Sequence, residues 1–154
     1  MDLYLVQHGV ALSKDEDPAR PISEVGRFEV TAVARRAAEL RLRLGEIRHS
    51  GKLRAQQTAE ILATHVASGS PPSVLRGLDP GDDPAPLVPS LEASDAPMTL
   101  VGHLPHLSRL ASLLVCDEPE RDVIAFRNGA LVQLVRTGET WSVRSVLTPE
   151  LAGA

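Results

Sequence analysis

The sequence predicts a three-layer α/β/α sandwich with a mostly parallel sheet. Short apolar runs alternate with segments of helical spacing along most of the chain, which is the order that βαβ units produce. Two of these runs end on a histidine beside a glycine, at His8 and at His103. The last two apolar runs flank Thr137–Glu139, which indicates a hairpin and therefore at least one antiparallel strand.

The predicted strands are short runs of aliphatic residues bounded by polar, glycine or proline residues. They are, in order, Leu3–Gln7, Ile47–Ser50, Val74–Leu75, Met98–Gly102, Ala130–Val135 and Trp141–Leu147. Residues 8–22 and 77–86 contain prolines and charged side chains, and both are predicted to be loops.

The predicted helices lie between these strands. Ser23 supplies a hydroxyl N-cap and Glu24 an acid in the first turn of the first helix, and Gly45 ends it. Its apolar face is formed by Phe28, Val30, Ala34, Ala37, Ala38 and Leu42. Pro105 suits a first helical position. The remaining helices are predicted at Leu53–Val66, Leu87–Ala93 and, after Pro105, Leu107–Val115.

Length and composition favour a single domain over residues 1–154, without a linker, an internal repeat or a lid insertion. Hydrophobic residues make up 43% of the chain but aromatic residues only 3%, so the core must be aliphatic. The net charge of -4 argues against nonspecific binding to nucleic acid. One cysteine excludes an internal disulfide framework. No signal peptide or membrane-length apolar run is apparent, so we expect a cytoplasmic protein without membrane contact.

The two strand-end histidines indicate a reaction centre. The carboxyl ends of parallel strands meet at one edge of an α/β sheet, where ligands bind. Arg54 begins a predicted helix just after a strand, where its guanidinium and the helix start both attract phosphate. An imidazole can be a covalent nucleophile, and phosphoryl transfer otherwise needs positioning and cations. The combination fits a metal-free phosphoryl-transfer site.

Four ordered motifs resemble those of the histidine phosphatase superfamily. They are Leu5-Val6-Gln7-His8-Gly9, Arg20-Pro21-Ile22-Ser23-x-x-Gly26, Ser50-x-x-x-Arg54-Ala55-x-Gln57-Thr58 and Val101-Gly102-His103-Leu104-Pro105. Size and spacing most resemble the SixA-type phosphohistidine phosphatases, and the likeness runs from Met1 to about Leu147. The resemblance implies a phosphoglycerate mutase-like fold and a phosphatase without metal or cofactor.

The resemblance also implies roles for individual residues. His8 is the expected nucleophile, which becomes phosphohistidine. Arg54 and His103 complete the phosphate pocket, Gln7 and Gly9 line it, and Arg20 lies beside it.

The chain departs from the family pattern at three places. Gln7 stands where the family has arginine. Glutamine lacks the positive charge of arginine and the paired N–H donors with which a guanidinium binds two phosphate oxygens. No clear carboxylate follows the second helix, although Asp79, Asp82 and Asp83 are near. An imidazole leaves more readily than an alkoxide, so a missing acid favours a phosphoramidate substrate. Gly51 replaces a frequent proline and is expected only to loosen a turn.

Three functions follow as hypotheses. The first is hydrolysis of phosphohistidine on a protein, such as a histidine phosphotransfer domain in signal transduction. The alternatives are a small-molecule phosphomonoesterase and a catalytically weak phosphate- or phosphoprotein-binding module.

Other residues with potential chemistry are given structural roles. The spacing of His103 and His106 lacks further ligands for a metal site. We expect His49 and His65 at the surface and Cys116 as a buried small hydrophobe.

Overall fold

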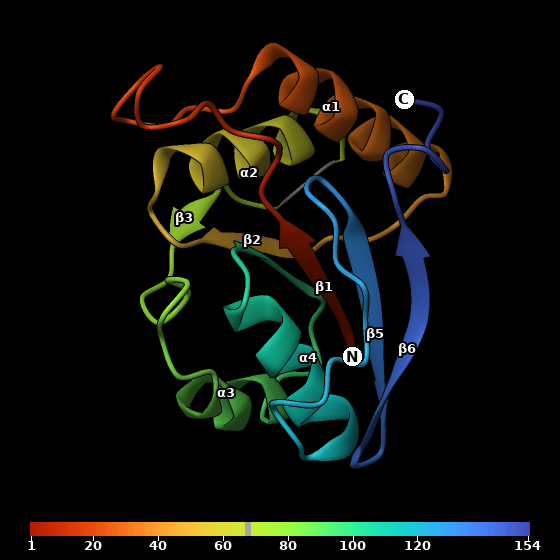
Figure 1. Cartoon of the computed structure of the whole chain (residues 1–154). Coiled ribbons are helices and arrows are strands. Elements are labelled where there is room, and N and C mark those ends of the chain that lie inside the picture. The colour runs from red at the N-terminus through yellow and green to blue at the C-terminus, as the bar shows by residue number, and fades with distance from the viewer. Residues whose placement is uncertain (67–68) are drawn as a thin grey trace.

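The computed structural model describes residues 1–66 and 69–154, and within them it contains one six-stranded sheet with helices on both faces (Figure 1). The strand order is β3-β2-β4-β1-β5-β6. The strands are β1 (Asp2–Gln7), β2 (Glu46–His49), β3 (Ser73–Val74), β4 (Met98–Gly102), β5 (Leu131–Thr137) and β6 (Thr140–Leu147). All six lie within two residues of the predicted runs.

The sheet is mostly parallel, as predicted. Strands β3, β2, β4 and β1 run in one direction, whereas β5 is antiparallel to β1 and forms a hairpin with β6. The carboxyl ends of β1 and β4 therefore meet at one edge, in a register that pairs Gln7 with Gly102. Because β5 runs the other way, it begins at that same edge.

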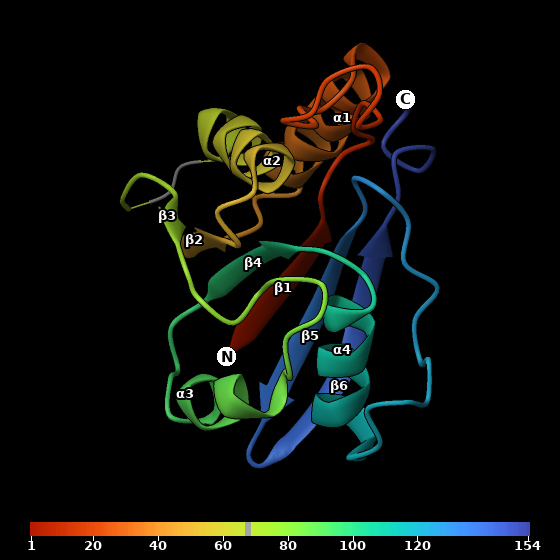
Figure 2. The same ribbon diagram turned by 60° about the vertical axis from the view of Figure 1, so that its left-hand side comes forward.

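The helices form two layers, one on each face of the sheet (Figure 2). Helices α1 (Glu24–Glu39) and α2 (Leu53–His65) cover one face. Helix α4 (His106–Cys116) and the short α3 (Val88–Glu92), which follows a 3-10 turn at Ala85–Leu87, cover the other. The predicted three-layer architecture is confirmed.

Strand β1 shows how the sequence builds two cores. Leu3 and Leu5 pack with the α4 side, whereas Tyr4 and Val6 pack with the α1–α2 side, because successive side chains point to opposite faces. All four are buried. Burial of each such side chain contributes roughly 1.5–3 kcal/mol, so this central strand is anchored from both faces.

Helix α1 begins as predicted but ends earlier. Ser23 Oγ accepts a hydrogen bond from the Gly26 amide at 3.0 Å, which confirms the N-cap. The last helical residue is Glu39 and not the residue before Gly45, because Arg41 adopts a left-handed conformation with φ 55°. The amides of Arg41 and Leu42 donate to the carbonyls of Ala38 and Ala37, which is a Schellman motif.

Several predicted side-chain environments are wrong. Phe28 was placed in the buried face of α1 but is 62% exposed, because the helix approaches the sheet through small and branched residues: Gly26, Val30, Val33, Ala34 and Ala37. His49 is buried at the end of β2, and Cys116 is only half-buried. Pro105 is the N-cap of α4 and not its first residue.

No helix in the described part of the chain is long and apolar enough to span a membrane.

Candidate active site

The strand ends bring the two motif histidines together. His8 follows β1 and His103 follows β4, and their ring centroids lie 4.9 Å apart with the planes tilted by 54°. The His8 amide donates to the Gly102 carbonyl, which extends the strand pairing to the site itself. The sequence motifs therefore converge at the predicted edge.

The hydrogen bonds of His8 define its tautomer. Its Nδ1 lies 2.7 Å from the Gly9 carbonyl oxygen, which can only accept, so Nδ1 carries the proton. Nε2 then holds a lone pair, and the Nε–H of Arg54 donates to it at 3.3 Å. Burial lowers the pKa of His8, and the positive charges of Arg54 and Arg20 lower it further. His8 is therefore a neutral imidazole with its lone pair on Nε2.

Helix α2 holds Arg54 and the His8 loop as one unit. Arg54 lies in the first turn of α2, where backbone N–H groups face outward. Thr58, fully buried one turn later, donates through Oγ1 to the Arg54 carbonyl at 2.8 Å and accepts from the Gly9 amide at 3.0 Å. Gln57 accepts from the Ile22 amide at 2.8 Å. The motif residues after Arg54 thus position the arginine against His8.

Gly9 has a structural role rather than the expected one in binding phosphate. Its amide already donates to Thr58 and is not available to a ligand. A Cβ at Gly9 would lie 2.8 Å from Val30 Cγ2, and a Cβ at Gly26 would lie 2.2 Å from the Val10 carbonyl oxygen. Both glycines let the loop after β1 pack directly on α1.

His103 is buried, 2% exposed, and its Nε2 lies 2.7 Å from Ser50 Oγ. Burial lowers its pKa to about 3, with further contributions from the charges of His8 and Arg54. The ring is therefore neutral. A bound anion would favour the charged ring and raise this pKa. Ser50, the first residue of the third motif, orients His103 through this hydrogen bond.

Gln7 is the last residue of β1, directly before His8. Its Oε1 is buried and has no hydrogen-bond partner among the described residues. The Gln7 carbonyl accepts from the Gly129 amide at 2.9 Å, and Asn128 Nδ2 donates to the His8 carbonyl at 2.9 Å. The segment before β5 therefore fixes the backbone of Gln7 and His8. Asn128 carries no motif in the sequence and was missed.

Arg20 lies where the resemblance implied, beside the pocket. Its φ of 50° is left-handed, and its Nε donates to the Leu12 carbonyl at 3.1 Å. The Arg20 amide donates to the Asp17 carbonyl at 2.9 Å. A polar pocket is lined by four cationic side chains, Lys14, Arg20, Lys52 and Arg54, of which Arg54 contacts His8.

The turn before α2 requires glycine. Gly51 has φ 90°, which proline cannot adopt, and its amide donates to His49 Nδ1 at 3.1 Å. The expectation that this glycine only loosens the turn is wrong. The bond also explains why His49 is buried.

The structure places the three aspartates after the second helix differently. Asp82 and Asp83 accept from the amides of Asp79 and Ala85 and so stabilise the loop. Asp79 and Asp82 both line the polar pocket, whereas Asp83 does not, and Asp79 pairs with Lys52 at 3.4 Å. In the described residues no group of three or more His, Cys, Asp or Glu side chains could hold a metal ion.

Comparison by sequence finds one curated relative. It is an uncharacterized protein of Picosynechococcus sp., 35% identical over 144 residues that cover 84% of this chain and 87% of the relative. At that identity and coverage the two proteins belong to one family. No protein family model matches the chain.

Comparison by structure finds the same fold in solved phosphatases. The protein histidine phosphatase SixA, complexed with tungstate, has a TM-score of 0.85 and 23% identity over 97% of both chains. A mycobacterial glucosyl-3-phosphoglycerate phosphatase has a TM-score of 0.72 and 19% identity over 93% of this chain and 96% of its own. A phosphoserine phosphatase mutant from Entamoeba histolytica has a TM-score of 0.73 and 13% identity, over 97% of this chain and 98% of its own. The fold is that of histidine phosphatases, as the motifs predicted.

Proposed function

Because the chain has the fold of the histidine phosphatase superfamily and belongs to one family with the Picosynechococcus protein, we propose that it is a metal-independent phosphatase acting on phosphohistidine in proteins. The observation that carries the proposal is the tautomer of His8. The Gly9 carbonyl holds the proton on Nδ1, which leaves the Nε2 lone pair facing Arg54.

The reaction has two displacements at phosphorus. His8 Nε2 attacks in line and forms a P–N bond as the bond to the leaving group breaks. Arg54, Gln7 and His103 donate to the phosphoryl oxygens, with Arg20 beside them. Water then attacks phospho-His8, inorganic phosphate leaves, and the imidazole is restored.

The charges of the pocket support a phosphohistidine substrate. An imidazole leaving group needs less help from an acid than an alkoxide, and no carboxylate is hydrogen-bonded to His8 or His103 in the described part of the chain. The adjoining polar pocket offers cations to a phosphorylated side chain. The SixA neighbour is itself a protein histidine phosphatase.

The partner proposed from this chemistry is a phosphorylated protein, such as a histidine phosphotransfer domain in a cytoplasmic signalling relay. A second candidate is a small-molecule phosphomonoesterase. One observation favours it: Asp79 lines the pocket beside Arg54 and could protonate an alkoxide.

Trapping of the intermediate tests the phosphatase. The parent protein, His8→Ala and the matched control His65→Ala are incubated with 32P-labelled phosphoramidate and quenched in base, where phosphohistidine survives. Label on the parent and on His65→Ala, but not on His8→Ala, is expected. Release of phosphate from a phosphohistidine protein should follow the same pattern.

A different result would indicate a phosphate-binding module. If the parent takes up no label, and His8→Ala binds tungstate as tightly as the parent, the catalytic proposal is wrong.

A further inference from the structure

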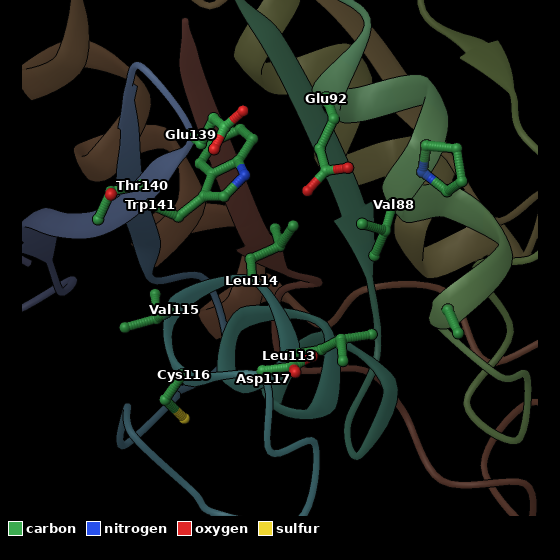
Figure 3. A pocket seen from close by; sticks show the side chains of 12 residues that line it. Val88, Glu92, Leu113, Leu114, Val115, Cys116, Asp117, Glu139, Thr140 and Trp141 are labelled. Atoms are coloured by element: carbon green, nitrogen blue, oxygen red, sulfur yellow. The ribbon is translucent and has the colours of Figure 1, made fainter.

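A second cavity lies at the opposite end of α4 from His103. It has a volume of about 520 Å³, within the range of small-molecule sites, and lies between α3, the last turn of α4 and the tip of the β5–β6 hairpin (Figure 3). Helix α4 begins three residues after His103 and ends at Cys116, which lines the cavity. Its 11 residues span about 16 Å, so the cavity is separate from the candidate active site.

The walls of the cavity are apolar. Its lining residues include Val88, Leu113 and Leu114, together with the ring of Trp141. Figure 3 shows these side chains converging from three elements. Such walls suit the apolar body of a ligand.

Trp141 carries an unused hydrogen-bond donor into this cavity. The side chain is 3% exposed, yet its Nε1 has no hydrogen-bond partner among the described residues. In Figure 3 the indole nitrogen lies on the side of the ring that faces Glu92 and Leu114. A buried N–H without an acceptor costs roughly 1–3 kcal/mol, so an acceptor brought by a ligand would relieve that cost.

The rim of the cavity is acidic. Glu92, Asp117 and Glu139 line it, and within the described ranges none of the three forms an ion pair. The carboxyl end of α4 adds partial negative charge. The nearby Arg136, 5.9 Å from the Trp141 ring centroid, is already paired with Asp95 at 2.8 Å. The field at the cavity therefore favours a cation.

We propose that this cavity binds a small amphipathic organic cation with a hydrogen-bond acceptor beside its apolar body. The apolar body packs on Leu113, Leu114 and the indole ring. The acceptor takes the Trp141 Nε1–H, and the cationic group lies at the Glu92 and Glu139 carboxylates.

Trp141 is the one tryptophan in the chain, so its fluorescence reports on the cavity directly. The protein is titrated with three probes that share the phenylalanine side chain: phenylalaninamide (cationic), N-acetylphenylalaninamide (neutral) and N-acetylphenylalanine (anionic). A saturable change with a Kd on the order of 1 mM is expected for the cation, with weaker binding of the neutral probe and weakest binding of the anion. Absence of a saturable change with the cation, or equal binding of all three, would overturn the proposal.

Variants test the role of the Glu92 and Glu139 carboxylates separately from that of the Trp141 Nε1–H donor. The double variant E92Q/E139Q should bind phenylalaninamide about three- to tenfold more weakly, while Glu60→Gln, on the other face of the sheet, should bind it as the parent does. By calorimetry, phenethylamine, which lacks the carbonyl, should bind the parent more weakly than phenylalaninamide. The two should bind Trp141→Phe alike. Unchanged affinity in E92Q/E139Q refutes the charge assignment, and a retained carbonyl preference in Trp141→Phe refutes the donor assignment.

Discussion

Arg54 donates its Nε–H to Nε2 of His8 at 3.3 Å, although the two residues lie on different elements. The contact points the Nε2 lone pair of the imidazole at the Arg54 guanidinium. A bound phosphoryl group would need that positive charge. Burial lowers the pKa of His8, and the contact lowers it further, since protonation would place a second positive charge against Arg54. In the proposed mechanism, the arginine that binds the phosphoryl group thus also keeps His8 neutral, the form that can attack phosphorus.

Gln7→Arg should raise kcat/KM for a phosphoramidate substrate about tenfold. A charged hydrogen bond contributes roughly 1–2 kcal/mol more than a neutral one, and that difference converts to this factor in rate. Gln7→Met, which removes the donor but keeps the length, should be slower than the parent. An unchanged or lower rate for Gln7→Arg would mean that Gln7 is not a weakened phosphate clamp.

Arg20→Gln should move the acid limb of the pH–rate profile to higher pH. The charge of Arg20 lowers the pKa of His8, so its removal lets the imidazole protonate closer to its ordinary value of 6.5. Arg27→Gln, on the exposed side of α1, is the control and should leave the limb in place. The idea fails if both variants titrate like the parent, whatever their rates.

The stability of the fold should fall as the pH drops from about 6.5 toward 3. In the unfolded chain His103 takes up a proton near 6.5, but in the folded protein its pKa is about 3, so acid favours unfolding in this window. The contribution is about 1.4 kcal/mol per pH unit. Above this window the stabilisation is fully present.

Urea unfolding at pH 7, 5 and 4 measures this slope. His103→Gln should be less stable than the parent at pH 7 yet lose less stability on acidification, while His65→Gln keeps the parent's slope. A parallel dependence in the parent and His103→Gln would exclude His103 as the source.

Thr58→Val should lower both stability and turnover. The change leaves the buried Gly9 amide without an acceptor, at a cost of roughly 1–3 kcal/mol, and frees the His8 loop from α2. Thr64→Val on the same helix loses an exposed bond to the Glu60 carbonyl and should change stability little. Urea denaturation and steady-state kinetics on both variants check this, and equal losses would contradict it.

Asp79→Asn distinguishes the two substrate classes. If Asp79 protonates an alkoxide, the variant should lose about a hundredfold in rate on phosphate monoesters and little on phosphohistidine. A control, Asp83→Asn, alters a carboxylate that caps the Ala85 amide. Equal small effects on both substrates would remove Asp79 from the mechanism.

The residues that the sequence located correctly are those whose signals are local. Strand runs, the Ser23 cap and the four motifs each depend on neighbours in the chain, and they placed His8, Arg54 and His103 at one edge. Asn128 could not be found in this way, because its contact with the His8 carbonyl joins residues 120 positions apart. The end of α1 was misplaced because Arg41 takes a left-handed conformation that sequence patterns assign to glycine.

The environments of Ser50 and His49 could not be predicted from the sequence either. Both environments depend on the positive φ of Gly51 and on the approach of His103. The spacing of apolar residues indicates neither of these features.

The central position of β1 has a consequence for how the molecule is made. Leu3 pairs with Met98 on one side and with Leu134 on the other, so the ribosome has to release most of the chain before this apolar strand gains either neighbour. Until then the apolar residues Leu-Tyr-Leu-Val are exposed to solvent on the nascent polypeptide. Strand pairs between residues so far apart in sequence form slowly, and exposed apolar segments favour aggregation. The strand that leads into His8 is thus exposed to aggregation until the later strands have been synthesised.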